Sequence, residues 1–417
     1  MANLKNKYGP WVSGPDFFDR EVEIRLLTEQ IDQGNNTLIV APRRVGKTSL
    51  VQETFLRMKE RNNYYLLYAD VQHCSTPEDV MVVISLKSYP HHALKDKVLS
   101  AFRDFWKHFR ENVESIGSNE LLEIKFREGL AGGDWRAKGQ KILQSLAQAD
   151  KPIVLCLDEL PIMLSRLLSA ANKGEYESRQ KDAGIFLSWL RQIMGNYQQR
   201  LRFIICGSIG LEPVLRRHGL SHTIAHLQPF ELASWSRKTA EDCLNALAVT
   251  YKVKWTAQTR NALLDSLGLY IPHHVQMFFG HLWIDCTKRD TNKITKTDVR
   301  RVYQNSMLSA RGHAELADYE ERLRRVFDPG SVMLALDLLT EAAVSGGLTP
   351  ENAAKLMKRF QLESPDKILR DVLDVLQHDG YLEWVEDRSA WCFISFLLKD
   401  WWKRRFSQGY VSPKGRR

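Results

Sequence analysis

Residues 41–49 read APRRVGKTS, which approaches the pattern G-x-x-x-x-G-K-[ST] of loops that bind phosphate groups. In such a loop the backbone N–H groups and the start of the following helix surround the phosphates. Gly46 would let the backbone come close, Lys47 would reach the β- and γ-phosphates, and Thr48 would place its hydroxyl on Mg²⁺. Ala41 replaces the first glycine, and its methyl group is tolerable if its φ stays negative. We therefore expect nucleotide contacts from Ala41, Pro42, Arg43, Arg44, Val45, Gly46, Lys47, Thr48 and Ser49.

Two carboxylates follow another apolar run. Residues 152–159 read PIVLCLDE, a strand pattern that ends in Asp158 and Glu159. In a parallel sheet this end of a strand faces the nucleotide crevice, where Asp158 would hold Mg²⁺ and Glu159 would orient and deprotonate a water. The run 201–206 (LRFIIC) leads to Ser208, whose hydroxyl would touch the γ-phosphate or that water. A strand running into an acidic turn, and a plain Gly-Ser turn, are the alternatives without function.

The segments around these motifs alternate between strand and helix patterns. Residues 37–40 (TLIV) indicate a buried strand, and residues 49–61 show the periodicity of a helix with one apolar face. Further strands are expected over 64–71 and 222–229. The pattern predicts an α/β fold, the three-layer parallel sheet of a P-loop NTPase.

In this order the features resemble the AAA+-related signal-transduction ATPases (the STAND type), and among them the small archaeal-type ATPases. The resemblance rests on FFDREVEIRLL (17–27), the 41–49 loop, PIVLCLDELPIML (152–164) and IICGSIGLEPVL (204–215). It implies ATP and Mg²⁺ as cofactors, an ATPase domain over 1–229, a helical lid over 230–308 and a winged helix over 320–406. It also implies that Phe18, within the first stretch, lies close to the adenine base.

The residues after Pro229 carry helix patterns, as a lid requires. Helices are expected over 236–251, 256–267, 272–286 and 295–308. In the resembled ATPases a proline at a turn of the lid contacts the base, and Pro272 is the candidate, although proline is common at a helix start for local reasons. His273 is either a phosphate sensor or an exposed residue of the first helical turn.

The C-terminal part follows a polar, charged connector. Helices over 331–343, 348–360 and 364–380, then a hairpin of 381–385 with 390–394 and a closing helix over 397–406, predict the winged helix. The third helix mixes acidic and basic residues, which favours a packing or switch role over DNA reading. A basic tail over 407–417 would hold nucleic acid non-specifically or only keep the end solvated. The segment 91–135 predicts a helical insertion that packs on the ATPase domain or docks a partner.

Composition narrows the class of protein. The 417 residues carry a formal charge of +9, which permits an acidic partner without showing one. The six cysteines have no metal-like spacing, which indicates reduced thiols and a cytoplasmic protein, and no run is long and apolar enough to cross a membrane. The sequence is consistent with an oligomer as well as with a monomer.

Three functions are consistent with these patterns. The first is a slow regulatory ATPase whose ATP and ADP states act on an unidentified protein partner. The second is a DNA-binding ATPase resembling origin-recognition or transposition helpers, and the third is a scaffold that binds nucleotide without turnover.

Overall fold

The computed structural model describes residues 4–102, 119–130, 134–169, 173–309, 314–360 and 364–413. The chain divides into two units. The sheet unit comprises Arg20–Val40 and Leu50–Glu231, and the loop unit comprises Met1–Asp19, Ala41–Ser49 and Leu232–Arg417. Parts of the expected insertion (103–118 and 131–133) and of the expected tail (414–417) lie outside the described residues.

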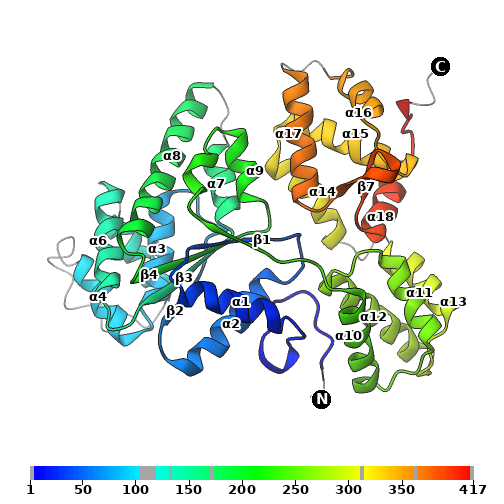
Figure 1. The fold of residues 1–417 in the computed structure, drawn as a ribbon, viewed down its shortest axis with the longest axis horizontal. Coiled ribbons are helices and arrows are strands. Elements are labelled where there is room, and N and C mark those ends of the chain that lie inside the picture. The colour runs from blue at the N-terminus through cyan, green and yellow to red at the C-terminus, as the bar shows by residue number, and fades with distance from the viewer. Residues whose placement is uncertain are drawn as a thin grey trace. The chain divides into compact units, whose positions relative to one another are not determined.

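A parallel sheet forms the centre of the sheet unit. Its strand order over the described residues is β2-β3-β4-β1-β5 (Figure 1). The strands are β1 (Thr37–Val40), β2 (Tyr65–Asp70), β3 (Ile153–Asp158), β4 (Leu201–Cys206) and β5 (Gln228–Glu231). Every residue of β3 and β4 is buried, so helices cover both faces of the sheet, as expected for parallel strands built from aliphatic residues. The α/β fold with a parallel sheet is confirmed.

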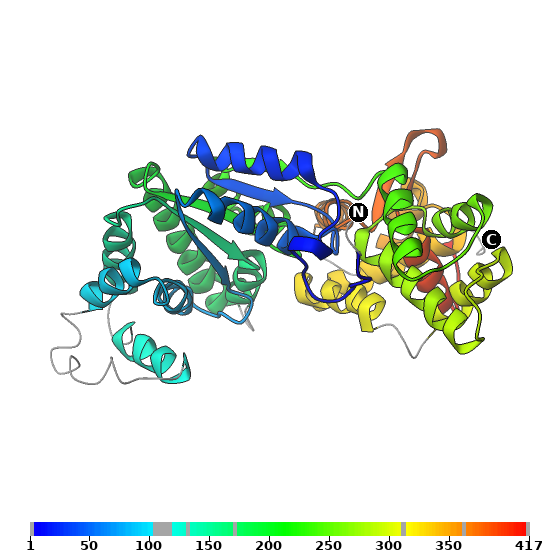
Figure 2. The same cartoon turned by 90° about the horizontal axis from the view of Figure 1, so that it is seen from below.

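The helices of the sheet unit occur before and between these strands along the chain, and Figure 2 shows helices packed around the sheet. They are α1 (Glu21–Asp32), α2 (Lys47–Arg61, which begins in the loop unit), α3 (Pro77–Ser88), α4 (His92–Phe102), α5 (Asn119–Leu130), α6 (Trp135–Ala147), α7 (Leu160–Leu168), α8 (Lys173–Asn196) and α9 (Leu211–Arg217). Between β2 and β3, α4 packs against α6 and α5 packs against α3. Of these helices, α4 and α5 lie within the expected insertion over 91–135.

The expected strand over 222–229 is wrong for residues 222–227. Residues Ser221–Ile224 form a 3-10 helix, and β5 begins only at Gln228. Thr223 turns the chain there, because both its backbone N–H and its hydroxyl donate to the carbonyl oxygen of Leu220, at 3.0 and 2.7 Å. Pairing with the sheet then starts where the N–H of Gln228 donates to the carbonyl oxygen of Asn36.

In the loop unit, α10 (Arg237–Thr250), α11 (Ala257–Leu267), α12 (Pro272–Lys288) and α13 (Lys296–Val302) lie within two residues of the expected lid helices, except at the end of α13. Polar caps begin three of them: Ser236, Thr256 and Thr295 each accept a hydrogen bond from a backbone N–H three residues on. After Val302 the chain widens into a short π-helix over Tyr303–Met307.

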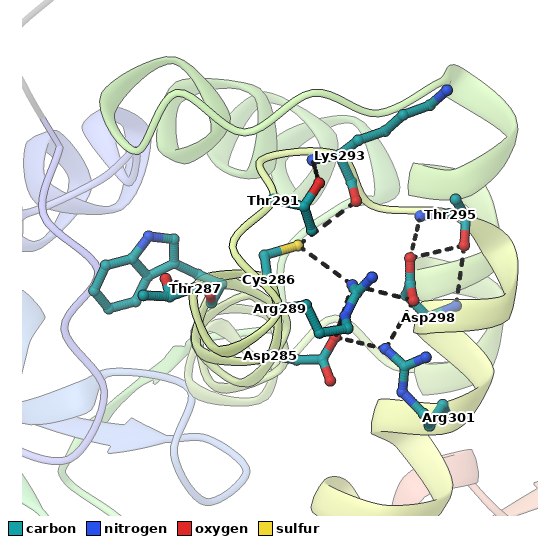
Figure 3. A network of polar contacts seen from close by, with 10 residues as sticks. Asp285, Cys286, Thr287, Arg289, Thr291, Lys293, Thr295, Asp298 and Arg301 are labelled. Atoms are coloured by element: carbon teal, nitrogen blue, oxygen red, sulfur yellow. Dashed lines mark hydrogen bonds and ion pairs between the residues drawn. The ribbon is translucent and has the colours of Figure 1, made fainter.

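A network of charged side chains joins α12 to α13 (Figure 3). The buried carboxylate of Asp298 lies 2.7 Å from Arg301 and 3.1 Å from Arg289, and both arginines also pair with Asp285. The thiol of Cys286 donates to the carbonyl oxygen of Lys293 at 3.7 Å. Alternating charges therefore hold the two helices together around the cap of α13.

The C-terminal elements are α14 (Ala314–Val326), α15 (Pro329–Ser345), α16 (Pro350–Met357), α17 (Pro365–His378), the antiparallel strands β6 (Leu382–Val385) and β7 (Ala390–Phe393), and α18 (Phe396–Phe406). The expected polar connector is in fact the helix α14 over most of its length. Leu316, Tyr319 and Leu323 form a buried stripe on it, and the charged residues between them conceal that stripe in the sequence.

The six cysteines all lie in the described part of the chain, and each is buried and unbridged. No helix of the described residues combines the length and the apolar character that a membrane span requires.

Candidate functional site

The 41–49 loop leaves β1 at Val40 and becomes α2 at Lys47. Ala41 keeps a negative φ, so its methyl group is accommodated as expected. Gly46 has a φ of +100°, and a Cβ atom there would meet nothing within 4 Å. Glycine is therefore needed at this position for its backbone conformation and not for space. The loop thus has the turn that precedes a helix N-terminus in phosphate-binding loops.

Lys47 is held inside this loop. Its side chain is buried, with 8% of the residue exposed, and Nζ donates to the carbonyl oxygens of Ala41 and Pro42, both at 3.0 Å. Nearby, the hydroxyl of Ser49 accepts a hydrogen bond from the N–H of Val12 at 3.1 Å. A buried ammonium at the start of a helix presents positive charge to an anion.

Two arginines of the loop contact other elements of the loop unit. Arg44 Nη1 donates to Nε2 of His273 on α12, at 2.9 Å. His273 is only 9% exposed, and Tyr8 packs its ring edge-on against it, so the expectation of an exposed histidine is wrong. Arg43 forms an ion pair with Asp318 on α14. The loop is therefore tied by side chains to both α12 and α14.

The two expected base contacts also belong to the loop unit. Pro272 is the first residue of α12 and is half-buried. Phe18 is half-buried as well, and its ring packs edge-on against Trp235 with the centroids 5.8 Å apart. Their contact with adenine stays a prediction.

In the sheet unit, Asp158 ends β3 and is 4% exposed. Its Oδ1 accepts from the thiol of Cys206 at 3.1 Å, and its Oδ2 accepts from the hydroxyl of Tyr68. Burial, reinforced by the charge of Asp158, raises the pKa of Tyr68, so this hydroxyl keeps its proton and donates. Neighbouring strands therefore orient the carboxylate.

Glu159 follows in a left-handed conformation, with a φ of +62°. Its Oε2 accepts from both the N–H and the hydroxyl of Ser208, at 2.8 and 2.9 Å. Gly207 permits this approach, because a Cβ there would lie 2.6 Å from Pro161. Ser208 thus bonds to Glu159, a contact that the sequence did not reveal.

These three polar residues share one edge of the sheet. Asp158 and Glu159 follow β3 and Ser208 follows β4, and the strands of the sheet pair in parallel. The carboxyl ends of β1, β3 and β4 therefore point to the same edge. Among the described residues no cluster of three or more His, Cys, Asp or Glu side chains is arranged as a metal site. At this edge Glu159, held by Ser208, is a carboxylate that can accept a proton.

Sequence reasoning missed Tyr68 and Cys206, the two donors to Asp158. Both lie inside strands, where their polar groups look like ordinary parts of a buried pattern. Only the register, which places Cys206 directly opposite Asp158, brings the thiol to the carboxylate.

Comparison with known proteins agrees with this geometry. Residues 17–234 match the family described as an ATPase domain predominantly from Archaea. No curated protein sequence matches the chain. The Walker-type ATPase PABY2304 of Pyrococcus abyssi has a similar structure, with a TM-score of 0.63, 15% identity, and coverage of 95% of this chain and 99% of that one. The ORC2 protein of Aeropyrum pernix, solved as ADPNP–ADP complexes, has a TM-score of 0.52 and 12% identity over 93% of each chain. At such identities the two structures establish the fold alone.

Proposed function

The chain belongs to the family of ATPase domains that come predominantly from Archaea, and we propose that it is a regulatory ATPase, in which ATP binding and slow hydrolysis switch the conformation that a protein partner meets. The observation that carries this proposal is the attachment of the phosphate-binding loop to the lid. Arg44 bonds to His273 on α12, so a ligand that moves the loop also acts on the lid.

The reaction is phosphoryl transfer from ATP to water. The water oxygen attacks the γ-phosphorus, the bond to the β-bridging oxygen breaks, and the proton passes to the carboxylate of Glu159. Lys47 and the loop N–H groups stabilise the charge that develops on the phosphate oxygens, and Ser208 keeps Glu159 in place.

The donor set suits Mg²⁺. Thr48 would supply a hydroxyl and Asp158 a carboxylate. Mg²⁺ usually takes only one or two such oxygen ligands from a protein, and phosphates and waters complete its coordination shell. When bound, Mg²⁺ would neutralise charge on the phosphates. Tyr68 and Cys206 support this assignment because they fix the orientation of Asp158 without neutralising it.

The adenine base would lie against Phe18 and Pro272. Both residues belong to the loop unit, together with the loop itself, so one nucleotide contacts the N-terminal segment and the lid through residues of the same unit. Such a ligand shifts the balance between two conformations only as far as it binds one of them more tightly than the other.

The proposed organisation is an ATPase domain over 1–229 with an insertion over 91–135, a lid over 230–308, a winged helix over 320–406 and a basic tail over 407–417. Support for the winged helix comes from the order α15, α16, α17, then the hairpin of β6 and β7. The buried, unbridged cysteines support a reducing, cytoplasmic compartment. We infer that the protein is a signal-transduction ATPase of the STAND type, a finer assignment that the parallel-sheet fold and the loop sequence support.

The charges near the C-terminus support the switch more than a DNA-binding role. Arg404 donates to the carbonyl oxygen of Gln304 and Arg405 pairs with Glu320, so these two arginines take part in contacts within the chain. On α17, Arg370 donates to the carbonyl oxygen of Asp366. A DNA-reading face normally shows a basic excess.

The test combines hydrolysis with limited proteolysis. We expect the wild type to hydrolyse ATP and Lys47→Ala to lose tight ATP binding, as measured by calorimetry. We also expect protease patterns over 230–325 to differ between the ligand-free, ADP and ATP-analogue states. Identical patterns in the three states would overturn the switch, and unchanged ATP affinity in Lys47→Ala would overturn the assignment of the loop. Pull-down with Glu159→Gln, loaded with ATP, against the wild type then identifies the partner.

A further inference from the structure

A buried guanidinium lies close to the phosphate-binding loop. Arg322 on α14 is 3% exposed, and its Nε, Nη1 and Nη2 form no hydrogen bond with any residue that the structure describes. Asp379 Oδ2 lies 3.8 Å from Nη2, near enough for an ion pair but too far for a hydrogen bond. Burying an arginine whose donors are unsatisfied is costly, so its presence calls for an acceptor.

The turn that carries Asp379 touches the loop. Gly380 has a φ of +78°, and a Cβ atom built there would lie 3.2 Å from Cβ of Pro42. The next residue, Tyr381, is buried and donates its hydroxyl to the carbonyl oxygen of Tyr319 at 2.7 Å. The turn therefore packs on the loop on one side and on α14 on the other.

The helix α14 meets the loop directly as well. Asp318 pairs with Arg43, and the ring of Tyr319 lies 5.4 Å from the guanidinium carbon of Arg43. Arg322 follows Asp318 by four residues, so both side chains project from the same face of the helix. The face that carries Arg322 is thus the face that contacts the loop.

The two arginines oppose one another electrostatically. Burial, reinforced by the nearby charge of Arg322, lowers the pKa of Arg43 to about 10. Like charges in a buried place repel one another. Asp318 pairs with Arg43, whereas Asp379 lies 3.8 Å from Arg322 and leaves its donors without hydrogen bonds to any described residue, so a further anion would stabilise the two arginines. A phosphate chain is such an anion, and the planar fork of a guanidinium matches phosphate oxygens in pairs.

We infer that Arg322 is a further ligand of the nucleotide's phosphate groups, so that the helix joining the lid to the C-terminal elements forms part of the ATP site; this inference rests on the function proposed above. Arg322 would gain the acceptors that its side chain lacks in the protein. Nucleotide binding would then act on α14 directly, in addition to its action on the lid through Arg44 and His273.

Calorimetry with ADP, a non-hydrolysable ATP analogue and pyrophosphate tests the inference. We expect Arg322→Gln to bind all three about tenfold to a hundredfold more weakly, since it loses charge-assisted hydrogen bonds. The matched control is Arg324→Gln on the same helix, where the exposed side chain pairs with Glu320, and it should bind like the wild type. Pyrophosphate has no base, so its weaker binding assigns the effect to the phosphates.

The melting temperature of the nucleotide-free protein separates this role from a structural one. A phosphate ligand predicts that Arg322→Gln melts at the same temperature as the wild type or higher, because a buried charge without hydrogen bonds is removed. Arg322→Lys keeps the charge beside Asp379 but not the planar fork, and we expect about threefold to tenfold weaker binding. If Arg322→Gln does not fold, Arg322→Lys decides the question.

Two outcomes contradict the inference, and they are distinguishable. If the wild type binds all three ligands, Lys47→Ala does not, and both Arg322 variants bind normally, then Arg322 is not a ligand while the proposed function stands. A lower melting temperature in this case would assign Arg322 to the ion pair with Asp379. If the wild type binds none of the three, the proposed function fails and the inference fails with it.

Discussion

Ser208 donates two hydrogen bonds to one carboxylate oxygen of Glu159: its N–H lies 2.8 Å and its hydroxyl 2.9 Å from Oε2. The serine at the end of β4 thus orients the residue that we propose as the general base. Ser208→Ala removes one of the two bonds, and we expect kcat for ATP hydrolysis to fall about tenfold with KM unchanged.

Glu159→Gln should lower kcat by roughly two to four decades while ATP still binds.

A double-mutant cycle establishes whether Ser208 acts through Glu159. In the Glu159→Gln background, Ser208→Ala should have little further effect, because the positioned base is already absent. Ser208→Thr, which keeps the hydroxyl, should retain most of the activity. A full tenfold loss in both backgrounds would mean that Ser208 contacts the phosphate or the water independently.

Most elements of the sheet were predictable because their signals are local. The run TLIV and the run LRFIIC are apolar, rich in β-branched residues and bounded by polar turns, and they form β1 and β4 with the expected bounds. The segment 222–229 also contains β-branched and aliphatic residues, but the hydrogen bonds of Thr223 to Leu220 hold its first residues in a 3-10 helix. In α14 the helical signal was present but masked by the many charges around its apolar stripe.

For the candidate site, the sequence could place only those residues that belong to a motif. The motif predicted that Lys47 lies where the loop becomes a helix and that Asp158 lies at the end of a strand, and both residues lie there. The hydrogen bond between Ser208 and Glu159 joins residues 49 positions apart in the sequence. The ion pair between Arg322 and Asp379 joins residues 57 positions apart. Contacts of that kind arise from tertiary packing, and no periodicity in one sequence reports them.

The adenine contact leads to a prediction for Phe18. We expect Phe18→Ala to lower the affinity for ATP about threefold to tenfold while tripolyphosphate binds unchanged, because an aromatic contact serves the base and not the phosphates. Trp11→Ala, an exposed aromatic residue in the same N-terminal segment, is the control. Calorimetry with both ligands measures the difference, and an equal loss for the two ligands would place Phe18 outside the base site.

Pro272→Ala should reduce the difference in protease protection between the ADP and ATP-analogue states more than it reduces hydrolysis. The reason is that Pro272 begins α12, the helix that also carries His273, and would contact the base and not the phosphates. Densitometry of the fragments beside a kcat measurement gives the comparison. Loss of hydrolysis with normal state-dependent protection would contradict this assignment.

The charged network between α12 and α13 should stabilise these two helices. Asp298→Asn removes the charge that pairs with Arg289 and Arg301. We expect these helices to lose about 1–3 kcal/mol of local stability. This loss is smaller than that for a fully buried ion pair, because both arginines are partly exposed. Asp242→Asn on α10, whose partner Lys238 is exposed, should change stability by less than about 0.5 kcal/mol. Hydrogen exchange of the α12 and α13 amides measures both, and equal effects would show that the network adds nothing.

His218 makes stability depend on pH. Burial of the imidazole, with a smaller contribution from the charge of Arg217, lowers the pKa of His218 from 6.5 to about 4. Between these values the unfolded chain binds a proton that the folded protein does not, so stability is full above pH 6.5 and falls as the pH drops towards 4. The hydroxyl of Tyr176 lies 2.9 Å from Nδ1 of His218 and forms a hydrogen bond with the neutral ring.

His218→Gln should therefore reduce the acid sensitivity of folding. We expect the decrease in melting temperature between pH 7.5 and pH 5 to be smaller in this variant than in the wild type, since one proton-linked penalty is absent. His222→Gln, at an exposed position a few residues on, should leave the decrease unchanged. Scanning calorimetry at the two pH values compares the three proteins. A wild-type decrease that His218→Gln reproduces in full would show that other groups account for the acid response, because the neutral amide of glutamine takes up no proton in this range.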